Sequence, residues 1–356
     1  MDWIKDVLAA LGTLLNGLPQ GLLALSYGFA SVPTALGFAI GIVGCVGFGS
    51  VVPISFQAET ITLAGTMGKD RRERLSMILF AGVAMVVLGA CGLLTQIIVL
   101  AGDAIVHGMM AGVGIMLARV AVDMVKGNKL VGGVSMGVGL AVYLLATTFK
   151  TGNELVFTII SCVVVSSIAG HVGGQRPDEA KAEQIGRFKL QKPTFNLRVF
   201  RGALALMCLT VGGNIAFGNI TGSIAGVNAN IDHLTIYSGL ADAVSALFGG
   251  GPVEAIISAT ASAPHAIFAA VLMMALMAVI LFSGLLPKIG KYIPSQSIAG
   301  FLFVLGALVT VPGDGAAAFS GTDGSPLVGG VTMVITAIVD PFVGMLAGIL
   351  LRLLGL

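Results

Sequence analysis

Apolar stretches separated by short polar breaks run through almost the whole chain. A helix needs about 20 mostly apolar residues to cross a bilayer, so the chain has room for about 12–14 membrane segments, some of them short. The apolar runs divide into about seven segments per half. They cover residues 6–30, 33–50, 53–67, 76–100, 105–125, 130–148 and 153–172, then 198–226, 235–250, 252–263, 265–286, 294–311, 327–339 and 341–355. The pattern predicts an all-α integral membrane protein.

The composition agrees with this prediction. Charged residues make up 10% of the 356-residue chain and hydrophobic residues 56%, and the mean hydropathy is +1.00. Soluble proteins have about 25% charged residues, so we predict a multi-pass protein of the plasma membrane, surrounded by lipid. The N-terminus carries Asp2 and Asp6 against Lys5, which does not suit the basic start of a signal peptide. The net charge of +2 gives no reason to expect nucleic acid as a partner.

Short stretches of the first half recur in the second half in the same order. The clearest pair is LVGGVSM at 130–136 with LVGGVTM at 327–333. Two weaker pairs are Gly92–Leu94 with Gly284–Leu286, and Gly21–Leu25 with Gly202–Leu206. We predict a first repeat at 1–175, a polar linker at 176–197 and a second repeat at 198–356. An odd number of segments per repeat makes the two repeats inverted in the membrane, as in many transporters.

The third and tenth segments, at 53–67 and 252–263, are too short to cross the membrane as helices. Both follow glycine-containing turns and begin with a proline, Pro53 and Pro252. Proline lacks an N–H and favours an extended entry or a first helical turn. Paired short segments of this kind, in matching positions of two halves, indicate the binding site of a transporter. We therefore predict half-helices at segments three and ten, with the substrate beside them.

Polar residues in these segments and in the eighth segment are the candidate ligands. A carboxylate inside the membrane is costly unless it is paired, protonated or hydrated, so Glu59 and Glu254 are functional candidates, unless they lie at segment ends in headgroup water. Asn214 and Asn219 offer amides that suit a nucleobase edge, or that hydrogen-bond between helices. The predicted substrate-binding residues are Ser55, Phe56, Gln57, Glu59, Asn214, Asn219, Val253, Glu254 and Ser258.

Other chemistry-bearing residues form no catalytic or metal-binding pattern. The four cysteines stand singly in apolar segments, and the four histidines have no ligand spacing. We expect Asp103, Asp242 and Asp340 to be helix caps or interfacial residues, and Asp340 before Pro341 to mark a helix break. The sequence therefore predicts no enzyme activity, no cofactor and no metal.

Three stretches resemble the nucleobase/cation symporter-2 family, which includes xanthine, uracil and adenine-guanine permeases. They are 102–116, 239–249 and 332–354. The resemblance implies two inverted seven-segment repeats, a core and a gate domain, a substrate between half-helices three and ten, and a homodimer. The related sulfate permease family shares this architecture, and Ile298–Phe301 is similar to it. The nucleobase family has a glutamate where this chain has Ser258, and Glu254 stands one turn earlier.

The first functional hypothesis is secondary transport of a small solute, with a nucleobase as the first candidate and H+ or Na+ as candidate coupling ions. The alternative is a sulfate-permease-like transporter of a small organic or inorganic anion. In that case the half-helix N-termini would bind the anion through their dipoles, with Glu59 and Glu254 pointing away. A third alternative is a membrane assembly subunit that does not transport.

Basic residues predict the orientation in the membrane, because they collect in short cytoplasmic loops. Nearly all basic loop residues follow the third, fifth, seventh and eleventh segments, for example at 69–74 and 187–192. This bias predicts that both termini lie outside. The family resemblance implies the opposite.

Overall fold

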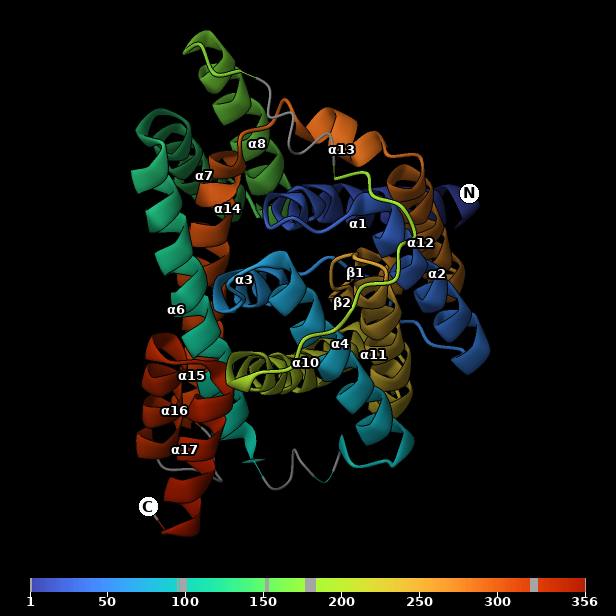
Figure 1. The fold of residues 1–356 in the computed structure, drawn as a ribbon, viewed down its shortest axis with the longest axis vertical. Coiled ribbons are helices and arrows are strands. Elements are labelled where there is room, and N and C mark those ends of the chain that lie inside the picture. Colours follow the sequence, from blue (N-terminus) through green and yellow to red (C-terminus); the bar gives the residue numbers. More distant parts are fainter. Residues whose placement is uncertain are drawn as a thin grey trace. The chain divides into compact units, whose positions relative to one another are not determined.

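The computed structural model describes residues 2–94, 96, 101–150, 154–176, 184–320 and 326–355. Within these residues, eight helices are long and apolar enough to cross a membrane. The chain is therefore an all-α, multi-pass membrane protein, as predicted. It forms two compact units (Figure 1), unit 1 from residues 1–97 and 181–288, and unit 2 from 98–180 and 289–356. Each unit takes segments from both predicted repeats, and the repeat boundaries stay a prediction.

Unit 1 contains the two broken segments. Its elements are α1 (Asp2–Ser26), α2 (Ser31–Phe48), β1 (Ile54–Ser55), α3 (Ala58–Met67), α4 (Arg71–Ala90), α10 (Leu197–Ile224), α11 (Ile231–Leu247), β2 (Glu254–Ala255), the 3-10 turn η1 (Ala259–Ser262) and α12 (Ala266–Phe282), and the short α13 (Leu285–Gly290) begins at its end. Most of these bounds fall close to the predicted segments. The exception is α4, which runs from Arg71 to Ala90 where the segment was expected at 76–100, and residues 95 and 97–100 of that segment lie outside the described residues.

Small residues bring the helices of unit 1 into close contact. Gly82 on α4 and Gly239 on α11 face each other, and a Cβ at Gly82 would lie 2.5 Å from the Gly239 carbonyl oxygen. A Cβ at Gly44 on α2 would lie 2.4 Å from the side chain of Tyr237 on α11. Such close approach is how helices associate in lipid, where there is no hydrophobic drive between them. Helix α11 therefore packs tightly against both α2 and α4.

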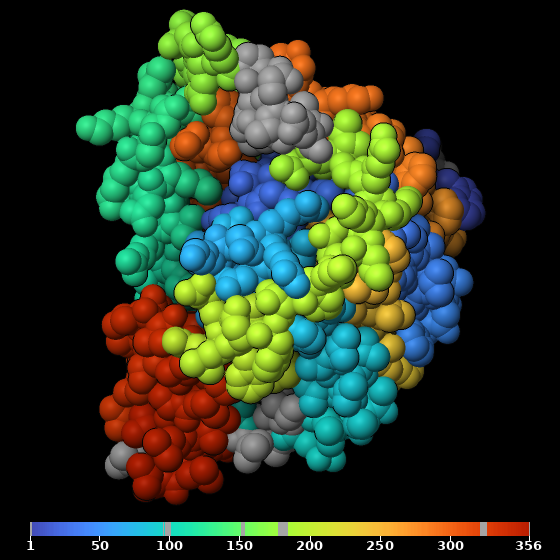
Figure 2. Space-filling model, in the orientation of Figure 1, coloured from blue at the N-terminus to red at the C-terminus, as the bar shows by residue number. Residues whose placement is uncertain are grey.

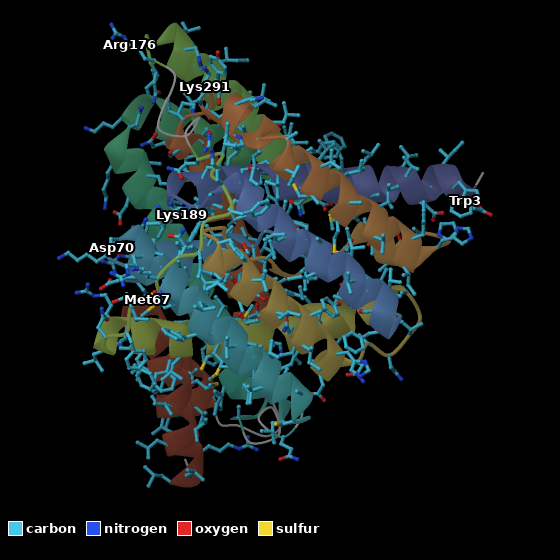
Figure 3. All side chains as sticks on the ribbon, turned by 45° about the vertical axis from the view of Figure 1, so that its right-hand side comes forward. Trp3, Met67, Asp70, Arg176, Lys189 and Lys291 are labelled. Atoms are coloured by element: carbon cyan, nitrogen blue, oxygen red, sulfur yellow. The ribbon has the colours of Figure 1, made fainter. Side chains whose placement is uncertain are left out.

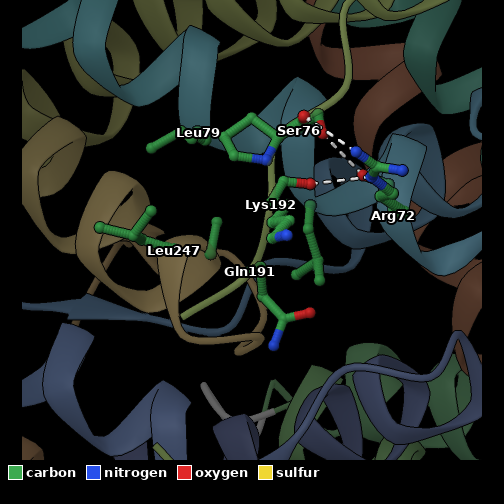
Figure 4. Close-up of a pocket in the computed structure, with 9 residues that line it drawn as sticks. Arg72, Ser76, Leu79, Gln191, Lys192 and Leu247 are labelled. Carbon is green, nitrogen blue, oxygen red and sulfur yellow. Dashed lines mark hydrogen bonds between the residues drawn. The ribbon is translucent and has the colours of Figure 1, made fainter. Parts of the chain in front are cut away.

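The described part of the predicted linker crosses unit 1 as an extended strap, visible on its surface in Figure 2. The carbonyls of Gln184 and Ile185 accept hydrogen bonds from the start of α2, at 2.8 and 2.9 Å. Arg72 donates to the carbonyls of Lys192 and Pro193 at 2.8 and 3.2 Å (Figure 4). The pocket beneath this contact has a volume of about 10 Å³, which is room for about one water molecule. The strap is thus a structural part of unit 1.

Unit 2 contains helices and helical turns and no described strand. They are α6 (Asp103–Gly127), α7 (Lys129–Thr148), α8 (Glu154–Val172), the turn η2 (Ser295–Ile298), α14 (Ala299–Phe303), the π-helical η3 (Val304–Thr310), α15 (Val311–Ser320), α16 (Pro326–Ile338) and α17 (Pro341–Leu353). Asp340 caps α17, accepting a hydrogen bond from the Val343 N–H at 2.9 Å, so the predicted break at this position is confirmed.

One predicted boundary in unit 2 is wrong. The segment expected to end at residue 311 continues as helix to Ser320. Pro312 and Gly313 suggested a stop, because proline contributes no N–H to a helix. Instead the chain widens into a π-helical turn directly before them, at Val304–Thr310, and the helix goes on. Such turns occur as insertions within longer helices.

Candidate functional site

The two broken segments meet inside unit 1 (Figure 1). Strands β1 and β2 pair antiparallel, with Ile54 opposite Ala255 and Ser55 opposite Glu254. A helix follows each strand. After β1 this is α3, with ten residues, and after β2 it is η1, a single turn of four residues. Segments three and ten are therefore interrupted, as their prolines and lengths predicted, and the helical part of segment ten is shorter than expected.

Neutral amides bind the N-terminus of α3. The backbone N–H of Ala58 donates to Oε1 of Gln20 on α1 at 2.8 Å. Gln57 is the N-cap residue, and its Oε1 accepts from the Thr60 hydroxyl at 3.1 Å. Its Nε2 donates to the carbonyl of Ala255 on β2. The first N–H groups of a helix have no partner within the helix, and Oε1 of Gln20 accepts a hydrogen bond from one of them.

Hydroxyl groups surround the second broken segment. Ser258 caps η1 and accepts a hydrogen bond from the Thr260 N–H at 3.1 Å. Its hydroxyl also lies 3.2 Å from the hydroxyl of Thr13 on α1. Thr221 on α10 donates to the Ile256 carbonyl at 3.0 Å. The side chains around both breaks are thus neutral donors and acceptors, apart from the carboxyls of Glu59 and Glu254.

Glu254 is buried beside a second carboxyl, that of Asp242 on α11. Glu254 is 2% exposed and Asp242 5%. The Thr210 hydroxyl donates to Oε1 of Glu254 at 2.7 Å, and the Val253 N–H donates to Oδ1 of Asp242 at 2.7 Å. Asp242 was expected to be a cap near a segment end. It lies within α11 (Ile231–Leu247) instead and is buried.

The remaining predicted ligands lie in different surroundings. Asn214 is buried and donates to the hydroxyls of Thr235 and Ser238 on α11, both at 3.1 Å, which is the interhelical alternative. Asn219 is exposed.

Four further candidates are buried. They are Phe56, whose ring lies 5.5 Å from that of Phe38, Val253, Glu59 in the first turn of α3, and Ser55. Glu59 and Glu254 are therefore enclosed by protein rather than placed at segment ends in headgroup water.

Sequence reasoning missed three residues that contact the broken segments. They are Thr13 and Gln20 on α1 and Thr221 on α10. Each is a buried polar side chain in a helix that is otherwise largely apolar, and this was the available signal. In the described part of the chain, no group of three histidine, cysteine or carboxylate side chains is placed to bind a metal.

No protein-family model and no curated protein matches the chain. Solved structures do match. The transmembrane domain of the cyanobacterial bicarbonate transporter BicA has a TM-score of 0.66 and 14% identity, over 98% of this chain and 97% of that one. The murine anion transporter SLC26A9, in its inward-facing state, has a TM-score of 0.70 and 13% identity, over 99% of this chain and 68% of that one.

The chain has the SLC26-type transporter fold. A second SLC26A9 structure agrees, with a TM-score of 0.70 and 12% identity, over 99% of this chain and 64% of that one. The chain therefore spans about two thirds of the SLC26A9 chains and nearly all of the BicA membrane domain. At these identities the likeness concerns the SLC26-type fold alone. It supports the sulfate permease architecture, and these three structures give no support to the nucleobase permease family.

Proposed function

We propose that this protein is a secondary transporter that carries a small inorganic anion across the membrane, and that the anion binds beside the N-terminus of α3 and the hydroxyls of η1. The observation that carries the proposal is the meeting of two interrupted segments at β1 and β2. Irregular backbone at membrane depth is tolerated only where protein or a water-filled cavity satisfies it. Paired interruptions of this kind accompany binding sites in transporters.

The chemistry around the breaks supports an anion. The N-terminus of a helix carries a partial positive charge and N–H groups without partners inside the helix, and α3 presents such an end within unit 1. The neutral Gln57 and Thr60 lie at this end, where they hydrogen-bond to Ala255 and to each other, and Glu59 is the one acidic side chain of the first turn. At η1 the hydroxyl of Ser258 bonds to that of Thr260. An anion held by neutral donors keeps a moderate affinity, which suits a carrier that has to release its cargo. The solved structures of similar fold include a bicarbonate transporter and an anion transporter.

The other hypotheses have weaker support. Nucleobase transport was the first candidate, but the side-chain amide of Asn214 donates its hydrogen bonds to the hydroxyls of Thr235 and Ser238. Ser258 supplies a hydroxyl where the nucleobase family has a glutamate. A role as a membrane assembly subunit that does not transport would not explain why two interrupted segments meet in one unit. We therefore favour the sulfate-permease-like alternative.

Uptake by purified protein in proteoliposomes tests the proposal. Labelled bicarbonate, sulfate and chloride are compared with labelled xanthine, uracil and a dicarboxylate, and empty liposomes give the background. The expected result is saturable uptake of at least one inorganic anion, reduced by the unlabelled anion. Uptake confined to a nucleobase, or no uptake above background, would contradict the proposal.

A further inference from the structure

Asp242 and Glu254 form a buried carboxyl pair next to the broken segments. Their electrostatic partners are each other, and their hydrogen bonds come from the Thr210 hydroxyl and the Val253 N–H. No lysine, arginine or histidine is among the described partners of either carboxyl. Two adjacent carboxylates cannot both stay ionised in such a site at low cost. The pair therefore needs a positive charge that the surrounding side chains do not supply.

The elements packed against the pair are α2, α4, α10 and β1, besides α11 and β2 themselves. Their titratable side chains are Cys45 on α2, Arg71, Arg72, Glu73 and Arg74 in the first turn of α4, Arg198, Arg201 and Cys208 on α10, and Asp232, His233 and Tyr237 on α11. Arg71, Arg72 and Arg74 bond to main-chain carbonyls at that end of α4. Arg198 bonds to Glu73 at 3.2 Å. These described bonds hold those four cations away from the carboxyl pair.

The buried Oε2 of Glu254 has no hydrogen-bond partner among the described residues. The hydroxyl of Ser55, which stands opposite Glu254 in the β1–β2 pairing, is likewise buried without such a partner, and it lies next to Gly17 on α1. Leaving a buried acceptor unsatisfied is costly. An unpartnered carboxylate oxygen beside a second carboxyl is a site for a proton.

We propose that Asp242 and Glu254 bind a proton that is transported together with the anion. This proposal rests on the proposed function, and it identifies the coupling ion of that same site. Uptake converts one carboxylate into a carboxylic acid, whose O–H then donates to the other carboxylate, and release restores two carboxylates. Glu254 directly precedes Ala255, whose carbonyl accepts the Gln57 bond at the start of α3. A change in the charge of the pair therefore affects β2, the strand that is hydrogen-bonded to Gln57 at the start of α3. The anion and the proton move in the same direction.

Infrared difference spectroscopy of the reconstituted protein tests the pair without any transport assay. At neutral pH the wild type should show a C=O stretch from a protonated carboxyl that shifts in deuterated water and disappears as the pH rises. The double variant Asp242→Asn with Glu254→Gln should lose this band. Asp123→Asn, which removes an exposed carboxylate paired with Lys126, should keep it. A band unchanged in the double variant, or absent from the wild type, overturns the proposal.

Proton movement is measured separately in proteoliposomes that contain a trapped pH-sensitive dye. An inward gradient of sulfate or chloride should acidify the lumen with wild-type protein and with Asp123→Asn. Uptake should fall as the outer pH rises, by at most about tenfold per unit for one linked proton. Glu254→Gln, checked for folding by gel filtration, should lose both the acidification and the pH dependence.

If Glu254→Gln does not fold, Glu254→Asp retains the acid and should keep the acidification. Anion uptake that requires Na+ and leaves the lumen pH unchanged would overturn proton coupling while sparing anion transport. An absence of uptake together with an intact infrared band would count against the proposed function and not against the proton site.

Discussion

Gln57 donates a hydrogen bond from its side-chain amide to the main-chain carbonyl of Ala255, and so joins the two interrupted segments across 198 residues of sequence. The same side chain accepts from Thr60 in the first turn of α3. One neutral amide thus fixes the start of α3 against β2. The position of each half of the proposed site depends on the other half.

Gln57→Ala should impair transport more than it impairs folding. Loss of one buried hydrogen bond costs about 1 kcal/mol, with more when the partner is left unsatisfied, so most of the protein should remain folded. The initial rate of anion uptake should drop severalfold, because α3 loses its tie to β2. Asn219→Ala removes an amide from an exposed position and is the matched control. Equal uptake rates in both variants would show that Gln57 has no part in the site.

Gly82→Ala should destabilise unit 1. The added methyl would lie 2.5 Å from the Gly239 carbonyl oxygen and 2.8 Å from the Ala243 nitrogen, both backbone atoms. Overpacking of this kind costs about 1–3 kcal/mol, and thermal unfolding in detergent should occur at a lower temperature. Gly47→Ala places its methyl on α2 with no atom within 4 Å and should unfold like the wild type. Equal melting of both variants would refute the close packing of α4 on α11.

The termini should lie outside the cell. Trp3 and Asp70 lie at opposite ends of unit 1 (Figure 3), so the N-terminus is far from the basic loop at 69–74, which the charge bias assigns to the cytoplasm. Of the free cysteines only Cys91 is exposed, and Cys91→Ser gives a background for labelling. An impermeant maleimide should label Asp2→Cys in intact cells, and Lys69→Cys only after permeabilisation. The reverse pattern would mean that the charge bias misleads.

We expect a homodimer, as the family resemblance implies for the gate domain. Gly133 and Gly137 on α7 form a GxxxG pair with no atom within 4 Å of either added Cβ, which is a pattern that favours helix association in membranes. In nanodiscs the particle should contain two copies of the 36.1 kDa chain. Gly137→Ile should shift it toward one copy. Monodisperse monomers of the wild type in both nanodiscs and mild detergent would rule the dimer out.

Much of the fold follows from local patterns in the sequence. Apolar runs gave most segment positions, and Pro53, Pro252 and Asp340 marked breaks that the structure contains. The helix beyond Thr310 was missed because Pro312 and Gly313 look like a stop, and a π-helical turn depends on packing that one segment does not reveal.

The composition of the site was harder to predict than its position. Glu254 was identified, but its partner Asp242 was not, because their contact joins two elements that are apart in the sequence. Asn214 turned toward α11 rather than toward the breaks. Which face of a helix meets which neighbour is decided by tertiary packing, and periodicity alone does not specify it.

The most direct test of the central claim is the initial rate of labelled sulfate, bicarbonate and chloride uptake into proteoliposomes, compared between wild type and Ser258→Ala. The hydroxyl of Ser258 links η1 to Thr13 on α1, and we place it beside the anion. Wild-type protein should take up at least one of these anions in a saturable manner, and Ser258→Ala should raise the concentration needed for half-maximal uptake while Asn219→Ala leaves it unchanged. Wild-type uptake of none of the three, or an identical concentration dependence in both variants, would contradict an anion site at the broken segments.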